Sequence, residues 1–148
     1  MSFTSFKSYF EGFNSLRVLI IGDVMVDSYL WGKADRISPE APVPIVSVIK
    51  RERRLGGAAN VAKNIFALGA TPILCSLVGD DHEGSYLVQL LEDNKFSKEG
   101  IVISKDRKTS VKQRVISGSQ QLLRVDSEDT HDLTEFELKN GLTVGVKP

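Results

Sequence analysis

Leu55–Gly69 reads LGGAANVAKNIFALG and combines a glycine pair with a strongly predicted helix. Apolar residues recur every three or four positions over Ala58–Leu68, which is the spacing of one buried helix face, and the closing glycine stands where a helix commonly ends. Gly56 and Gly57 precede the helix directly, so a ligand can approach the main chain closely there. The unpaired N–H groups of the first turn and the Asn60 side chain could then hold hydroxyls or an anion. A tight turn that needs glycine only for its backbone conformation explains the pair equally well.

Short apolar runs on both sides of this helix predict parallel strands. Arg17–Gly22 (RVLIIG) and Thr71–Val78 are continuous apolar runs, typical of strands buried on both faces. A second helix is predicted over His82–Asp93 and a third strand over Ile101–Ile103. The alternation of strands and helices predicts an α/β fold with a mostly parallel sheet and flanking helices.

A second, smaller β layer is predicted from residues 43–49 and 109–126. Val and Ile are frequent in the first segment, and the second segment reads as two strands around a Ser-Gly-Ser turn. The proline-rich stretch Ser38–Pro44 predicts an extended loop or the entry to a strand. The charge run Lys50–Arg54 (KRERR) is interpreted as a solvated turn, in preference to a binding role. Residues 1–148 are predicted to form one α/β unit that includes this small β layer.

Composition excludes several classes of function. The chain has 148 residues, of which 41% are hydrophobic and 26% charged, and its 19 basic and 19 acidic residues give a formal net charge of zero. Nucleic-acid binding or binding to an acidic membrane surface would favour a basic excess. The single cysteine, Cys75, excludes an internal disulfide and a zinc site built from several cysteines. Since no apolar run approaches the ~20 residues of a membrane-spanning helix and no signal peptide is recognisable, a cytoplasmic protein is expected.

Candidate ligand-binding side chains lie outside the glycine pair as well. Asp27 follows the first predicted strand, at the sheet edge where α/β proteins bind ligands, and a carboxylate can accept hydrogen bonds from two neighbouring sugar hydroxyls. A turn-capping role for Asp27 is an equal alternative. Lys112 and Arg114 lie two positions apart on a predicted strand and so share a face, with Arg124 on the partner strand. These cations could clamp a phosphate, although protection of an exposed strand from aggregation is the simpler explanation.

Taken together, these segments resemble the PfkB, or ribokinase-like, family of carbohydrate kinases. The family signature is carried by Gly56, Gly57, Asn60, Gly69 and Gly79. Within the family, the stretches GDVMVDSYLWG (22–32), RISPEAPVPIV (36–46), LGGAANVAKNI (55–65) and QQLLRVD (120–126) are similar to heptose 7-phosphate kinases, which often form the N-terminal domain of bifunctional ADP-heptose synthases.

The resemblance implies a central α/β layer with a β lid over the sugar. It implies that Asp27 binds sugar hydroxyls and that Gly56, Gly57 and Asn60 line the same pocket. Lys112 and Arg114 would be lid residues near the substrate phosphate, with Arg36 and Arg124 as further candidates. It also implies a homodimer formed through the lid strands, and an intact enzyme that uses ATP and Mg²⁺ to phosphorylate the C1 hydroxyl of a heptose 7-phosphate for lipopolysaccharide synthesis.

One family feature is absent from this sequence. The GAGD motif, whose aspartate is the general base and whose glycines form the anion hole, does not occur. The chain is therefore expected to correspond to the N-terminal half of a kinase, with no catalytic residue or metal ligand of its own and no tight binding of ATP or Mg²⁺. On this basis the chain alone is predicted to be inactive as a kinase. The alternatives are a non-catalytic module that dimerises through the lid, or part of a kinase for another sugar phosphate.

Overall fold

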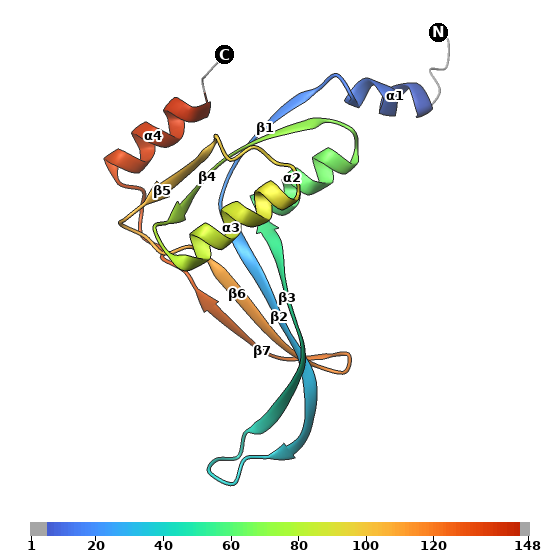
Figure 1. Ribbon diagram of the computed structural model, residues 1–148, viewed down its shortest axis with the longest axis vertical. Helices are drawn as coiled ribbons and strands as arrows, with labels where there is room; N and C mark the ends of the chain where they lie inside the picture. The colour runs from blue at the N-terminus through green and yellow to red at the C-terminus, as the bar shows by residue number, and fades with distance from the viewer. Residues whose placement is uncertain (1–5, 146–148) are drawn as a thin grey trace.

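The computed structural model describes residues 6–145, with side chains described to residue 140. Two β-sheets share the chain with four helices (Figure 1). The elements in chain order are α1 (Phe6–Phe13), β1 (Arg17–Ile21), β2 (Val24–Ile37), β3 (Pro44–Gly57), α2 (Ala58–Ala67), β4 (Thr71–Gly79), α3 (His82–Asp93), β5 (Ile101–Ser104), β6 (Val111–Ser117), β7 (Gln120–Ser127) and α4 (Glu135–Gly145).

The first sheet is parallel, as the apolar runs predicted. Its strand order is β1-β4-β5, and both pairs of neighbours run in the same direction. Parallel neighbours require crossover connections. The predicted helices over 58–68 and 82–93 supply two of the segments between these strands, so this part of the prediction is confirmed.

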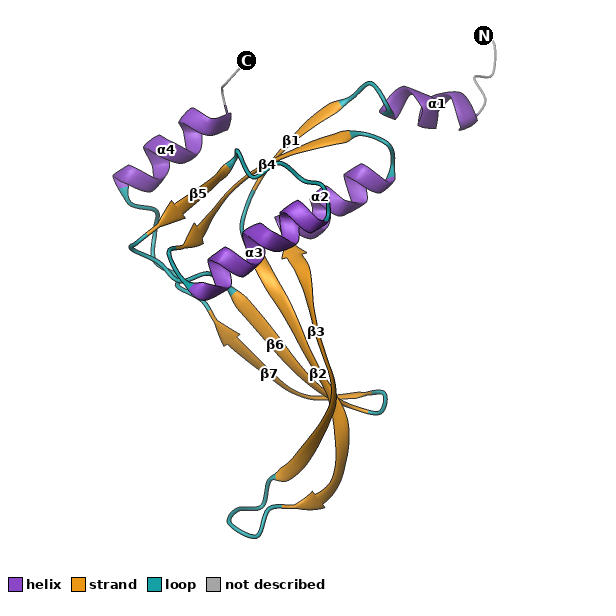
Figure 2. Cartoon of the chain, in the orientation of Figure 1, coloured by secondary structure: helices purple, strands orange, loops and turns teal. Residues whose placement is uncertain are grey.

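The core lies where α2 and α3 meet the two sheets. Both helices contact β3 and β4, and Figure 2 shows them crossing the junction between the sheets. The buried cluster joins apolar side chains from every one of these elements: Val24, Val26, Leu55, Ala59, Leu74, Val78, Leu87, Leu91 and Phe96. Gly69, at the end of α2, has a φ of +99°, which confirms its predicted place as a terminating glycine.

The second sheet is larger than predicted. Its order is β3-β2-β6-β7; β2 and β6 are parallel, and the two outer pairs are antiparallel. The predicted strand over 43–49 extends to residue 57 as β3, and β2 was not predicted as a strand at all. The two strands predicted within 109–126 are confirmed as β6 and β7.

The interpretation of Lys50–Arg54 as a turn was wrong, because all five residues belong to β3 and pair with β2. The placement of Asp27 at the end of the first strand was also wrong, since it lies inside β2. Both errors have one physical cause. Polar and charged side chains are compatible with a strand when the sheet face that they occupy is open to solvent.

The long β2–β3 hairpin extends away from the helices and curves near its middle (Figure 1). Register shifts at Trp31/Gly32 and Lys33/Arg36 coincide with this region, as expected for bulges, which bend and twist a strand pair. Among residues 6–145, no helix is long and apolar enough to cross a membrane.

Candidate functional site

One face of the four-stranded sheet gathers most of the predicted site residues. The register pairs Asp27 on β2 with Arg54 on β3 and with Lys112 on β6. Tyr29, two positions further, is paired with Glu52 and Arg114. Because directly paired residues project to the same side and alternate residues of a strand share a side, all of these side chains lie on one face, called here the Asp27 face.

The Asp27 face is rich in charge. Its members are Met25, Asp27, Tyr29, Trp31, Lys50, Glu52, Arg54, Gly56, Lys112, Arg114, Arg124 and Asp126. Five of these side chains are cations and three are carboxylates, in a chain whose formal net charge is zero. The face therefore combines hydrogen-bond acceptors for hydroxyl groups with an excess of positive charge for an anion.

An ion pair between Asp27 and Arg114 lies at the centre of this face. Arg114 Nη1 donates to Asp27 Oδ1, and the two side chains are 23% and 21% exposed. The hydrogen bond to Asp27 raises the pKa of Arg114, and partial burial opposes it. The Arg114 guanidinium also lies 5.4 Å from the centre of the Tyr29 ring. Asp27 is thus held in place by one oxygen and still borders solvent.

The glycine pair brings the end of β3 against this carboxylate. A Cβ atom at Gly56 would lie only 2.6 Å from Asp27 Oδ2 and 2.7 Å from Met25 Cγ. Gly57 has a φ of +58°, and a Cβ there would collide with the Asp23 carbonyl oxygen. Glycine is therefore required at both positions for close approach of the chain, and at Gly57 also for backbone conformation.

Lys112 and Arg124 lie beside the Asp27–Arg114 pair, on the same face of the sheet, as predicted. Arg124 Nε donates to Asp126 Oδ1 at 2.9 Å, and Lys112 Nζ lies 3.6 Å from Asp126 Oδ2 and 3.1 Å from Glu128 Oε2. Partial burial acts to raise the pKa of Asp126, but the hydrogen bond from Arg124 and the two cationic charges outweigh it and lower that pKa. These cations already have carboxylate neighbours, so a phosphate group would bind among exchangeable ion pairs.

Two predicted site residues, Asn60 and Arg36, are not among the members of the Asp27 face. Asn60 is exposed in the first turn of α2. Arg36 is exposed and pairs with Ile45 near the tip of the hairpin, nine residues from Asp27. At about 3.3 Å per residue that separation is roughly 30 Å along a strand. The structure therefore groups Asp27, Gly56, Lys112, Arg114 and Arg124, with Gly57 beside them, but not Arg36.

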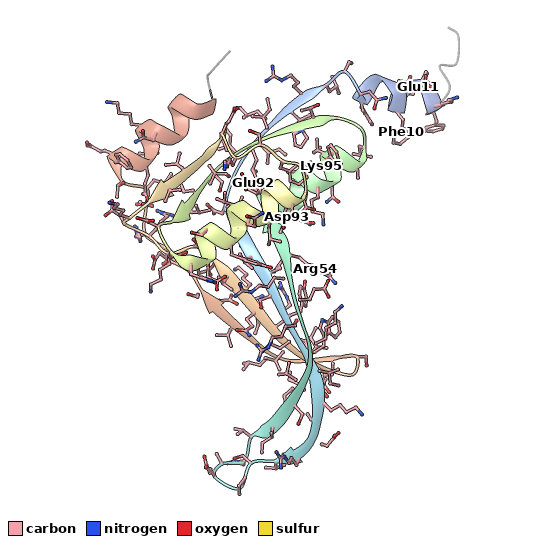
Figure 3. All side chains as sticks on the ribbon, viewed as in Figure 1. Phe10, Glu11, Arg54, Glu92, Asp93 and Lys95 are labelled. Atoms are coloured by element: carbon pink, nitrogen blue, oxygen red, sulfur yellow. The ribbon has the colours of Figure 1, made fainter. Side chains whose placement is uncertain are left out.

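Sequence reasoning missed the part of the face that β3 and the outer half of β2 provide. Tyr29 and Trp31 stack with ring centres 6.1 Å apart, and the Arg54 guanidinium lies 4.9 Å from the Tyr29 ring centre (Arg54 is labelled in Figure 3). Hydrogen bonds from Arg54 and then Lys50 lower the pKa of Glu52 to about 2. Residues 24–30 read VMVDSYL and do not alternate apolar and polar residues, so the sequence carried no clear local signal for this strand.

The described residues show neither a metal-ligand cluster nor a common phosphate-binding loop. Within residues 6–145, no group of three or more His, Cys, Asp or Glu side chains is arranged to hold a metal ion. The sequence contains neither of the common phosphate-binding loops, GxxxxGK[ST] or GxGxxG.

In sequence, the chain is similar to known carbohydrate kinases. Residues 15–143 match the pfkB family of carbohydrate kinases. The chain is 47% identical over 122 residues to "Bifunctional protein HldE" of Citrifermentans bemidjiense, and 50% identical over 124 residues to the protein of the same name from Helicobacter acinonychis. These alignments cover 82% and 84% of this chain but only 25% and 27% of the relatives, so the chain spans about a quarter of their length.

Solved structures show the same fold. A putative ribokinase from Agrobacterium tumefaciens superimposes with a TM-score of 0.63 at 17% identity, over 84% of this chain and 42% of that one. An uncharacterised sugar kinase from Pyrococcus horikoshii, solved in complex with ATP, gives a TM-score of 0.53 at 26% identity, over 77% of this chain and 34% of that one. The fold of this chain is thus ribokinase-like, and the match over residues 15–143 shows that the chain belongs to the pfkB family of carbohydrate kinases.

Proposed function

We propose that this chain supplies the sugar-recognition part of an ATP-dependent kinase that phosphorylates the C1 hydroxyl of a heptose 7-phosphate, a step toward ADP-heptose for lipopolysaccharide. The observation that carries the proposal is the Asp27 face, where a carboxylate beside a glycine cradle is surrounded by cations. The high identity to proteins named HldE supports heptose as the sugar.

In this proposal, Asp27 is the hydroxyl acceptor. One of its oxygens accepts from Arg114, which leaves Oδ2 as the acceptor for a sugar hydroxyl. The Asp27 side chain is partly exposed, so the hydroxyl would reach Oδ2 from the solvent side of this face, while Gly56 packs closely against the carboxylate. Arg114 acts as a positioning residue that fixes the direction of the carboxylate.

Lys112 and Arg124 are the proposed contacts of the substrate phosphate. A phosphate monoester carries about −1.5 to −2 charges at neutral pH, more than the single charge of Asp126. It can therefore compete for both cations, which Asp126 now shares. Arg54 is a further cation on this face. It lies on β3, where it is paired with Asp27.

Transfer of the phosphoryl group requires parts that these residues do not provide. ATP would supply that group, and this chain contains no GAGD motif to supply a general base and an anion hole. The sugar kinase from Pyrococcus horikoshii was solved with ATP, which supports a nucleotide as the co-substrate of the whole enzyme. We expect the 148-residue chain alone to bind sugar phosphate without turning over ATP.

Calorimetric titration with heptose 7-phosphate tests this proposal. The wild-type chain should bind, and Asp27→Asn should weaken binding at least tenfold because an amide accepts fewer hydrogen bonds than a carboxylate. Asp93→Asn is the matched control, since Asp93 is exposed on α3 and accepts a hydrogen bond from Gln89 Nε2 (Figure 3). A folded chain that shows no binding, or two variants with the same affinity, would contradict the proposal. Tighter binding of another sugar phosphate would reassign the substrate.

A homodimer through the four-stranded sheet is the second proposal. Val115 on β6 and Leu123 on β7 are paired on the face opposite to Asp27, and Leu123 is 55% exposed. Val125, also on that face, is 50% exposed. Covering these side chains with the same face of a second copy would remove apolar surface from water. This contact is also compatible with a purely non-catalytic dimerisation module.

Sedimentation equilibrium distinguishes the monomer from the dimer. The wild-type chain should be a dimer and the Leu123→Lys variant a monomer, because the lysine places a charge in the proposed interface. Leu16→Lys, at an exposed position outside both sheets, should leave the mass unchanged. A monomeric wild-type chain at high concentration would reject the dimer.

A further inference from the structure

A cavity of about 600 Å³ lies on the face of the sheet opposite to Asp27, between β2, β3, β6 and the beginning of α3. Ser28, Arg51, Arg53, Glu83, Tyr86 and Gln113 are among the residues that line it. Since Ser28 is paired with Arg53 and Gln113, these three side chains share a face and alternate with Asp27, Arg54 and Lys112. The volume is within the range of small-molecule sites.

The wall toward α3 is polar. Arg53 Nη2 donates to Glu83 Oε1 at 2.7 Å, and its guanidinium lies 4.6 Å from the centre of the Tyr86 ring. Glu83 Oε2 is buried and has no hydrogen-bond partner in the described part of the chain. An unpaired buried acceptor is unfavourable, because it has lost its hydrogen bonds to water and gained none in their place. A hydroxyl group of a bound molecule would remove this cost.

The wall toward β3 provides a cation. Arg51 lies two positions before Arg53 on β3 and therefore projects to the same face. It lines the cavity, and no carboxylate within residues 6–140 forms an ion pair with it. A guanidinium without a carboxylate partner is well suited to bind a phosphate. The hydroxyl of Ser28 and the amide of Gln113 lie between the two walls as further hydrogen-bonding groups.

We propose that this cavity is a second binding site, separate from the Asp27 face, for a small phosphorylated polyol whose phosphate contacts Arg51 and whose hydroxyl donates to Glu83. Both the phosphate and the hydroxyl group of such a molecule are needed to match the charged groups of the cavity. An anion without hydroxyls would leave Glu83 Oε2 unpaired, and an uncharged polyol would leave Arg51 without a counter-ion.

The test is an NMR titration of the ¹⁵N-labelled 148-residue chain with glycerol 3-phosphate. The side-chain N–H signals of Gln113, Arg51 and Arg53 report on the cavity, whereas those of Arg54, Arg114 and Arg124 report on the Asp27 face. We expect the first set to shift in a saturable way. Inorganic phosphate alone and glycerol alone should each bind at least tenfold more weakly.

Two variants separate this proposal from nonspecific attraction. Arg51→Gln should weaken binding at least tenfold, and Glu83→Gln should also weaken it because the carboxylate acceptor is lost. Arg17→Gln, an identical change on β1, should have no effect. Circular dichroism checks that each variant is folded. Because Arg51 is exposed, Arg51→Gln should disturb the fold less than Glu83→Gln. The proposal is overturned if no signal of the first set shifts, if only the Asp27 face responds, or if Arg51→Gln binds like the wild type.

Discussion

Two arginine–carboxylate pairs in this protein have the same chemistry and opposite surroundings. Arg107 donates to both oxygens of Glu137, at 2.7 and 3.3 Å, and Glu137 is completely buried. Arg114 donates to one oxygen of Asp27, and both of these side chains remain about one-fifth exposed. Both oxygens of Glu137 are therefore occupied, and this pair has no acceptor left for a ligand. The Asp27–Arg114 pair still has Asp27 Oδ2 available as an acceptor.

The closed pair anchors α4 to the rest of the molecule. Thr134 N donates to Glu137 Oε2 and Glu137 N donates to Thr134 Oγ1, so the pair is combined with a reciprocal cap at the start of the helix. The helix contacts β4 and β5, and Figure 1 shows it beside β5. Burial acts to raise the pKa of Glu137, but hydrogen bonds from Arg107, Thr134 and Ser104 outweigh it and lower that pKa to about 2.

The largest expected effect comes from opening the closed pair. Glu137→Ala leaves the Arg107 charge buried without a partner and removes the helix cap, so the free energy of unfolding should fall by about 3–5 kcal/mol. Urea denaturation measures this loss. Asp27→Ala is the comparison: its pair borders solvent, and the expected loss is about 1 kcal/mol or less. Equal losses of unfolding free energy for the two variants would show that the different burial of the two pairs does not change their contribution to stability.

The pH dependence of stability should report the same contrast. Because the pKa of Glu137 is about 2 in the folded chain and 4.5 in the reference state, its contribution is fully present above pH 4.5 and disappears as the pH falls toward 2. The contribution is on the order of 3 kcal/mol. The difference in stability between the wild type and Glu137→Gln should therefore shrink over this range, as measured by urea unfolding at successive pH values. A difference that stays constant down to pH 2 would contradict the lowered pKa.

The region around α2 and α3 was largely predictable from the sequence. Continuous apolar runs predicted β1 and β4, and the stripe that includes Ala62 predicted α2. Each signal is local, since a strand buried on both faces must be apolar and a helix packed on one side must repeat at its own period. Position 56 was singled out for the same reason: a glycine beside a helix start is visible without knowledge of its neighbours.

The four-stranded sheet was less predictable because its information is not local. Charged residues such as Arg54 are compatible with a turn or with an open strand, and only the pairing with β2 decides between them. The contact between Asp27 and Arg114 joins residues 87 positions apart, and no spacing rule gives such a pair. The missing partner of Glu83 Oε2 also becomes visible only after folding.

The glycine pair allows stability and binding to be separated. Gly57→Ala combines an unfavourable φ with a collision against the Asp23 carbonyl, so it should cost about 1–3 kcal/mol of stability. Gly56→Ala meets mainly the side chains of Asp27 and Met25, which can move. It should therefore lose affinity for heptose 7-phosphate with a smaller change in stability. Urea denaturation and calorimetry on both variants measure the two effects. A Gly56→Ala chain that keeps the wild-type affinity would show that close packing of Gly56 against Asp27 does not matter for sugar binding.

The smallest expected effect concerns Arg114, and it separates charge from geometry. Arg114→Gln removes the group that orients Asp27, so affinity for heptose 7-phosphate should fall about tenfold, which is about 1.4 kcal/mol. Stability should change by less than about 1 kcal/mol because the pair is partly exposed. Arg114→Lys restores the charge but not the planar guanidinium that lies over Tyr29. If calorimetry shows that lysine recovers little of the lost affinity, orientation of the carboxylate is what Arg114 contributes. If lysine recovers all of it, the open pair acts through charge alone and differs from Arg107–Glu137 only in its exposure.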